Sequence, residues 1–138
     1  EEAKLARNEE EIPVGAIIIQ NAKLIARAHN QPILKNDPTA HAEIQVIRLA
    51  AEKIKNYRLV NATLYVTLEP CMMCIGAIMH ARIKRVVYGA HDSKNELCKY
   101  CDNQFSSKKP NHKLIIKSGI LENECKELLQ SFFELRRK

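Results

Sequence analysis

The sequence predicts an α/β fold with three layers, in which helices cover both faces of a five-stranded mixed β-sheet. Two patterns support this prediction. Two runs rich in β-branched residues come early in the chain and are separated by only a few residues, as in a β-hairpin. Strand-like and helical segments then follow one another, which is typical of a sheet that carries helices on its faces. Because domains cluster near ~100 to 150 residues, the 138 residues are expected to form a single domain, 1–138.

Five segments are predicted to be β-strands. The first two are Val14–Gln20 and Leu24–His29, and the polar turn Asn21-Ala22-Lys23 between them completes the expected hairpin. The other three strands are expected at Ala62–Leu68, Arg85–Tyr88 and Lys113–Lys117.

Two segments are predicted to be neither helix nor strand. Residues 1–11 are polar apart from Ala3, Leu5 and Ala6, which are too few for a helix of that length. The chain does not begin with methionine, and we expect further residues to precede Glu1. The long segment from His91 to His112 is also polar.

Three helices are predicted. Asp37 and Pro38 are expected to begin the first, because aspartate is a favoured N-cap and proline suits the first helical position. The second is expected to run from Pro70 to about Arg82, and the third to begin at Leu121. The apolar positions that mark the buried side of the first helix are Ile44, Ile47, Ala51 and Ile54.

Two of these helices carry informative apolar patterns. The last one has apolar residues at helical spacing, so Cys125 is expected in the core rather than at a reactive site. The segment Cys71–Ile83 is apolar nearly all round, with only His80 and Arg82 as polar residues. Such a helix must be buried on more than one side, and a second copy of the chain, as in a homodimer, is the natural partner.

Composition limits the class of protein. The longest apolar run, Val14–Ile19, is far shorter than the ~20 residues that cross a bilayer, so a soluble cytoplasmic protein without a membrane segment is expected. The net charge of +6 favours an anionic partner. Five cysteines, an odd number in a chain without an export signal, indicate metal or catalytic thiols rather than disulfides.

Cys71 and Cys74 form the first candidate site. Three residues apart at the start of a helix, their sulfurs lie on one face and can hold one metal ion, and the helix N-terminus favours the thiolates that zinc requires. The same pair could be a redox dithiol, although the methionines between and after the cysteines argue against it. Together with Cys98 and Cys101 it could instead form a closed four-thiolate site, the mark of a non-catalytic zinc-ribbon module.

His41 and Glu43 favour a different completion of the site. His41, Cys71 and Cys74 would supply three ligands and leave a fourth position open for water, which is the arrangement of a catalytic zinc site. Glu43 does not suit a thiolate-rich ligand set, so it is free to take a proton from the water. This combination predicts hydrolysis.

These residues match the pattern HxE followed by PCxxC, and the sequence resembles the bacterial tRNA-specific adenosine deaminases within the zinc-dependent cytidine/deoxycytidylate deaminase superfamily. The resemblance covers essentially the whole chain. It rests on Ile12-Pro13-Val14-Gly15-Ala16, Asn30-Gln31-Pro32, Asp37-Pro38-Thr39-Ala40-His41-Ala42-Glu43-Ile44, Ala62 to Cys74 and Arg85-Val86-Val87-Tyr88-Gly89-Ala90.

The resemblance implies a cytidine deaminase-like fold, one Zn²⁺ per chain and hydrolytic deamination of the wobble adenosine of an arginine tRNA to inosine. A zinc-bound hydroxide would attack C6 of adenine while Glu43 shuttles the proton. It further implies a homodimer that binds the anticodon loop. Substrate contacts are implied for Ile12, Asn30, Asp92, Lys94, Phe132 and Arg136.

Some features depart from the family or leave alternatives open. His91 and Ser131 stand where some relatives carry charged residues, and the Cys98 and Cys101 pair lies outside the family pattern. A deaminase of cytosine, guanine or deoxycytidylate would share every residue of the zinc site, so only the flanking resemblance and the basic charge favour tRNA. The zinc-ribbon module remains the alternative without catalysis.

Overall fold

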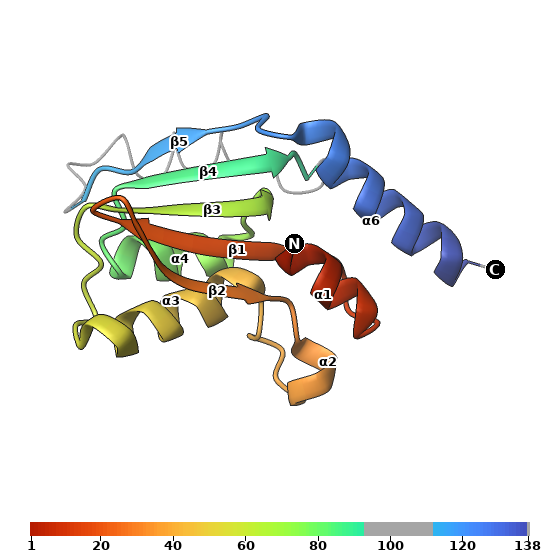
Figure 1. The fold of residues 1–138 in the computed structure, drawn as a ribbon, viewed down its shortest axis with the longest axis horizontal. Helices are drawn as coiled ribbons and strands as arrows, with labels where there is room; N and C mark the ends of the chain where they lie inside the picture. Colours follow the sequence, from red (N-terminus) through yellow and green to blue (C-terminus); the bar gives the residue numbers. More distant parts are fainter. Residues whose placement is uncertain (93–111, 138) are drawn as a thin grey trace.

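The computed structural model describes residues 1–92 and 112–137 and contains the predicted five-stranded mixed sheet (Figure 1). Its strands lie in the order β2-β1-β3-β4-β5. The hairpin pair and the β1–β3 pair are antiparallel, whereas the β3–β4 and β4–β5 pairs are parallel. The bounds are β1 Gly15–Gln20, β2 Lys23–His29, β3 Ala62–Leu68, β4 Arg85–Ala90 and β5 Ile115–Lys117.

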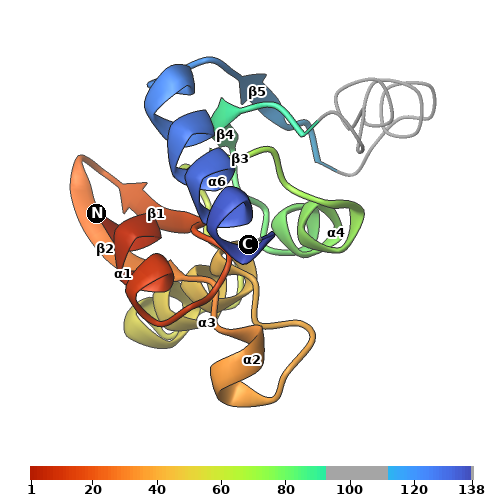
Figure 2. The ribbon, with the colours of Figure 1, turned by 90° about the vertical axis from the view of Figure 1, so that its right-hand side faces the viewer.

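Helices cover both faces of the sheet, which confirms the three predicted layers (Figure 2). Helices α3 and α4 lie on one face, and α1 and α6 lie on the other, while α2 is a single turn beyond the end of β2. The bounds are α1 Glu2–Asn8, α2 Pro32–Lys35, α3 Ala42–Ile54, α4 Met72–His80 and α6 Glu122–Arg136. No helix of the described ranges is long and apolar enough to cross a bilayer.

The main core lies between the sheet and the α3–α4 layer. Alternate strand residues point into it because successive side chains of a strand face opposite ways, and Ile18, Leu64 and Val86 are fully buried. Val46 of α3 and Ile78 of α4 pack against them. Each such side chain stabilises the fold by about 1.5 to 3 kcal/mol relative to an exposed one.

The hairpin forms as predicted. Asn21 and Ala22 have φ angles of 51° and 62°, and two consecutive positive φ values are the mark of the type I′ turn that suits the twist of paired strands. Asparagine accepts this conformation easily, whereas alanine does so at a cost that the pairing of β1 with β2 offsets.

The prediction that residues 1–11 form no helix was wrong, because α1 spans Glu2–Asn8. A helix this short gains its stability from tertiary packing rather than from its own propensity. Ala3 and Ala6 are buried against the sheet, and Gly15 permits the close approach. A Cβ atom at Gly15 would lie 2.5 Å from the backbone nitrogen of Ala3.

The predicted start of the first long helix was also wrong. Asp37 does not cap it, because its carboxylate accepts hydrogen bonds from the backbone N–H and the hydroxyl of Thr39 at 2.8 and 2.7 Å. This local turn competes with helix formation. Helix α3 therefore begins at Ala42 with His41 as its N-cap residue, and the turn α2, which the sequence did not indicate, precedes it.

The centre of the buried stripe on α3 differs from the prediction. Ile47, Ala51 and Ile54 are only partly buried at the margin of the core. The fully buried apolar residues are Ala42, Val46 and Ala50, since the small side chains allow the helix to lie close to the sheet.

The last helix agrees with its prediction. Cys125 and Phe132 are its buried residues, so Cys125 is a core side chain as expected. A Cβ atom at Gly89 would lie 2.5 Å from the sulfur of Cys125, so glycine is what lets α6 pack closely against β4. An apolar groove of about 380 Å³ remains between α1 and α6 on this face of the sheet, lined in part by Ile17 and Tyr65.

Candidate functional site

Helices α3 and α4 begin at the same end of the sheet, beyond the C-terminal ends of β2 and β3 (Figure 1). His41 and Cys71 are their N-cap residues, and both have extended backbone conformations that point the chain into the helix. Cys74 follows one turn into α4. The two helix N-termini therefore bring their positive ends together, an environment that favours thiolates.

The three candidate ligand atoms form a nearly equilateral triangle. Nδ1 of His41 lies 3.6 Å from the sulfur of Cys71 and 3.5 Å from that of Cys74, and the two sulfurs are 3.6 Å apart. A tetrahedral zinc ion with bonds of ~2.3 Å to sulfur and ~2.0 Å to nitrogen spaces its ligand atoms roughly 3.5 to 3.8 Å apart. The residues therefore form a group that can hold a metal ion, and the donor set fits zinc.

The protonation of the three groups is coupled. A hydrogen bond from the side chain of Cys74, together with one from His41 and one from the backbone N–H of Cys74, lowers the pKa of Cys71 to about 4. The same thiolate raises the pKa of Cys74, which is also raised by burial, and its hydrogen bond raises the pKa of His41. The proton shared by the two sulfurs therefore favours Cys74 over Cys71, and the binding of a metal ion by both cysteines must release it.

Glu43 lies beside this triangle and is 4% exposed. Burial is the main reason why the pKa of its carboxyl group is raised, and a hydrogen bond from Cys74 opposes the shift. A raised pKa makes a carboxylate a stronger base, which suits a group that must take up a proton and pass it on. Glu43 is therefore suited to moving a proton next to a bound metal ion.

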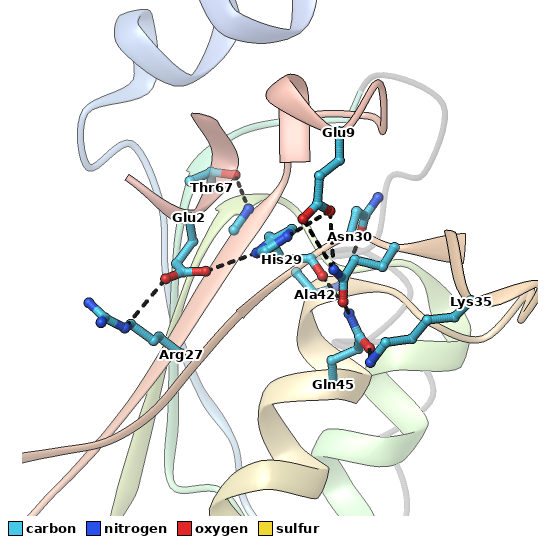
Figure 3. A network of polar contacts seen from close by, with 11 residues as sticks. Glu2, Glu9, Arg27, His29, Asn30, Lys35, Ala42, Gln45 and Thr67 are labelled. Carbon is cyan, nitrogen blue, oxygen red and sulfur yellow. Dashed lines mark hydrogen bonds and ion pairs between the residues drawn. The ribbon is translucent and has the colours of Figure 1, made fainter. Parts of the chain in front are cut away.

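Asn30 connects the end of β2 to the start of α3. Its Oδ1 atom accepts a hydrogen bond from the backbone N–H of Ala42 at 2.8 Å (Figure 3). The backbone N–H of Asn30 donates to the carbonyl of Val14 at 3.0 Å. Within the described part of the chain no partner is found for the amide nitrogen of the side chain. Asn30 thus offers a donor next to the metal group.

Two other residues that were predicted to contact the substrate lie at the same end of the sheet. Ile12 is 41% exposed and precedes β1, and Asp92 is partly buried just after β4. Lys94, Cys98 and Cys101 lie outside the described residues.

Phe132 and Arg136 lie at the C-terminal part of α6. Phe132 is buried, which agrees with core packing, and the guanidinium of Arg136 stacks 4.7 Å from the centre of its ring. Arg136 also donates to the carbonyl of Glu10, so the end of α6 is fastened to the segment that leads to Ile12.

Two buried polar residues next to α2 were not predicted. Glu11 accepts hydrogen bonds from the backbone N–H groups of Ile33 and Leu34 at 3.3 and 2.9 Å and thereby holds α2 in place. Gln45 is buried on α3, where it bonds to the end of β2 and to α2. No local pattern in the sequence singles out Gln45, because its partners lie at the end of β2 and on α2.

Known proteins share both the sequence and the fold. Residues 1–137 match the MafB19-like deaminase family. The tRNA-specific adenosine deaminase of Buchnera aphidicola subsp. Baizongia pistaciae is 48% identical over 136 residues, which are 99% of this chain and 84% of that protein. This chain belongs to the tRNA-specific adenosine deaminase family. The family member of Haemophilus influenzae is 50% identical over 129 residues, 93% of this chain and 75% of that protein.

A solved structure extends the likeness to three dimensions. It comes from studies of A-to-I editing by tRNA:A34 deaminases at the wobble position of transfer RNA, and it superposes with a TM-score of 0.86 at 44% identity. The match covers 93% of each chain. The tRNA-specific adenosine deaminase family and the cytidine deaminase-like fold inferred from the sequence are therefore confirmed.

Proposed function

We propose that this protein converts adenosine to inosine by hydrolytic deamination at the wobble position of tRNA in the cytoplasm. The single observation that carries the proposal is the His41, Cys71 and Cys74 triangle with the buried carboxyl group of Glu43 beside it. Family membership adds the substrate class, because the relatives are tRNA-specific adenosine deaminases. An arginine tRNA is the proposed substrate, as the sequence resemblance implies.

His41, Cys71 and Cys74 would hold one Zn²⁺ per chain. When bound, zinc supplies a Lewis acid that lowers the pKa of water at the open fourth position toward neutrality. The two cysteine thiolates would offset the positive charge of the ion. The positive ends of both helices face the cysteines and favour their thiolate form.

Glu43 would carry the proton. Its carboxylate takes one proton from the attacking water and delivers it to the ring nitrogen of adenine, then takes the remaining proton from the new C6 hydroxyl group and delivers it to the departing amine. The C6–O bond forms first and the C6–N bond then breaks to release ammonia, so one water is consumed and atoms and protons balance. Burial supports this role, because it holds the pKa of Glu43 above its ordinary value.

Asn30 and Ile12 would hold the base. The side-chain oxygen of Asn30 already accepts a hydrogen bond from Ala42, so its amide nitrogen is the atom that can donate to the purine. Ile12 offers an exposed apolar side chain against which a flipped-out base can pack.

The RNA path would follow the basic C-terminal part of α6. The net charge of +6 favours a polyanion, and Arg136 is fixed on α6 by its contact with Phe132. Asp92 and Lys94 would contact the RNA where the chain leaves β4.

A homodimer would cover the apolar start of α4. Met72 and Met73 are 61% and 38% exposed, although they directly follow the ligand Cys71. Large apolar side chains that gather at the surface mark association sites, and two-fold pairing is the commonest way to cover them.

Incubation with candidate substrates tests the proposed function. The zinc-loaded protein is mixed in separate reactions with total tRNA, free adenosine, cytidine and guanine, and the products are separated by chromatography after nuclease digestion. Inosine in the tRNA alone supports the proposal. Conversion of a free base or nucleoside, with tRNA left unchanged, would instead favour a small-molecule deaminase.

A further inference from the structure

A row of side-chain hydrogen bonds joins α2 to the residue after α1 across the edge of the sheet (Figure 3). The ammonium of Lys35 donates to Oε1 of Gln45. Nε2 of Gln45 donates to Oε1 of Gln31 at 3.1 Å, and Nε2 of Gln31 donates to Oε2 of Glu9 at 3.1 Å. Four side chains from three separate segments are thus connected one after another, because Gln31 and Lys35 stand at the two ends of α2.

The row has one direction. Lysine can only donate hydrogen bonds and an ionised carboxylate can only accept them, so its two ends fix how both amides between them are oriented. Hydrogen bonds that run in the same direction polarise and strengthen one another. The bond from Gln31 is the main reason why the pKa of Glu9 lies below its ordinary value, which keeps the accepting end ionised.

A histidine holds the accepting end of the row. Nε2 of His29 lies 3.0 Å from the same Glu9 carboxylate, and Nδ1 of His29 lies 3.0 Å from the carboxylate of Glu2. Glu2 begins α1 and Glu9 directly follows it, so both ends of this helix are fastened to the end of β2.

Hydrogen bonds hold both neighbours of Asn30 in the chain, His29 and Gln31. The amide nitrogen of Gln45 also donates to the carbonyl of His29 at 2.6 Å, and the backbone N–H of Gln31 donates to the carbonyl of Ala40 at 3.0 Å. The residues before and after Asn30 are therefore held, and its own side chain meets Ala42 at the start of α3.

Gln45 connects the first turn of α3, which begins at His41, to the segment around Asn30. It lies one helical turn after His41, and its backbone N–H donates to the carbonyl of His41 at 3.0 Å. Its side chain is buried, so its hydrogen bonds form away from competing water. The distance from His41 to Asn30 is thus set by a rigid helix turn and an amide with one orientation.

We propose that Gln45 and Gln31 are positioning residues that set where Asn30 meets the target base, so that this row of hydrogen bonds determines affinity for the RNA substrate. The inference rests on the proposed function, because it takes Asn30 as a group that binds the base. Neither glutamine touches the reacting atoms, and the loss of either acts through Asn30.

The first test replaces Gln45 by methionine, which has a similar volume and no amide. Gln45→Met is expected to lower kcat/KM on an anticodon stem-loop RNA by about 10-fold to 100-fold, chiefly through KM, since the base is misplaced rather than the proton transfer disabled. Zinc content is expected to stay at the wild-type level. The matched control is Gln20→Met, because Gln20 donates to the carbonyl of Val60 at the opposite end of the sheet, and its kinetics should not change.

The second test asks whether Gln45 acts through Asn30. RNA affinity is measured by titration in the inactive Glu43→Ala background for Asn30→Ala, Gln45→Met and the double variant. If the position of Asn30 is the whole effect, the double variant binds no more weakly than Asn30→Ala alone. If Gln45→Met does not fold, Gln31→Met at a less buried position takes its place in the same cycle.

The outcomes separate the two claims. The positioning role alone is overturned if the wild type forms inosine in tRNA but the two losses of RNA affinity in the cycle are additive. It is also overturned if Gln45→Met leaves RNA affinity unchanged. Absence of inosine in every tRNA reaction of the wild type overturns the proposed function and this inference with it.

Discussion

The Nδ1 atom of His41 and the sulfur of Cys74 lie 3.5 Å apart, although 33 positions separate the two residues in the sequence. Strands β2 and β3 both pair antiparallel with β1, so they end at the same end of the sheet, where α3 and α4 begin. The metal group therefore depends on two helix starts that the fold places side by side, and removal of one ligand should dismantle it.

The first prediction concerns the ligand set. Wild-type protein should contain about one zinc ion per chain, and Cys71→Ser should lose it because a hydroxyl is a poor replacement for a thiolate. The double variant Cys98→Ser and Cys101→Ser should keep its zinc. Metal content is measured by atomic emission after gel filtration, and loss of zinc from the double variant would support the zinc-ribbon alternative.

The second prediction separates catalysis from metal binding. Glu43→Ala removes the proton carrier but no ligand, so zinc content and melting temperature should be maintained. Deamination of tRNA should fall by about 10²-fold to 10⁴-fold, the usual loss for a general acid and base. Near-normal turnover of this variant would refute the role given to Glu43.

The strands could be predicted, and the group of His41, Cys71 and Cys74 could be located, because their signals are local. Runs of β-branched residues marked β1 and β3, and the helical spacing of Cys71 and Cys74 placed both sulfurs on one face. The candidate site also needed His41 as the third ligand, with Glu43 two residues further on to move the proton, and the sequence shows this spacing directly.

The missed features depend on tertiary contacts. Helix α1 is too short to form alone and requires the contact of Ala3 with Gly15. The start of α3 moved because Asp37 bonds to Thr39 instead of capping the helix. The role of Gln45 follows from partners on β2 and α2 whose proximity no local pattern could indicate.

The third prediction follows from the raised pKa of Glu43. Below the carboxyl pKa of the unfolded chain, near 4.5, both states are protonated and the group does not affect stability. As the pH rises, the unfolded chain ionises first, so the metal-free native state loses stability relative to it. The variant Glu43→Gln lacks this penalty. In urea unfolding, the free energy of unfolding of Glu43→Gln should exceed that of the metal-free wild type by little at pH 4 and by more at pH 8.

A constant difference between the two proteins at both pH values would contradict this account, because only an ionising group changes its contribution with pH. The measurement uses metal-free protein on both sides, since a bound cation would itself favour the ionised carboxylate.

The fourth prediction concerns the RNA partner. Neutralisation of phosphates releases counterions, so affinity should fall with salt at a logarithmic slope of about 0.7 per single-stranded contact. Arg136→Ala and Lys94→Ala should each flatten this slope by about one contact. The control is Arg58→Ala, an exposed arginine that stacks on Tyr57 beyond the end of α3. Affinity without salt dependence in the wild type would point to a small neutral substrate.

The last prediction concerns assembly. If a second copy covers the exposed start of α4, light scattering at micromolar concentration should give the mass of a dimer. Met73→Glu should then yield monomers, because a carboxylate would be buried in an apolar contact. Zinc retention should also weaken, since Met73 directly precedes the candidate ligand Cys74 and the same contact would hold this turn of α4. Val60→Glu, at an exposed apolar position beyond the opposite end of the sheet, should remain a dimer with zinc. A wild type that stays monomeric and fully active at these concentrations would show that activity does not need the second copy.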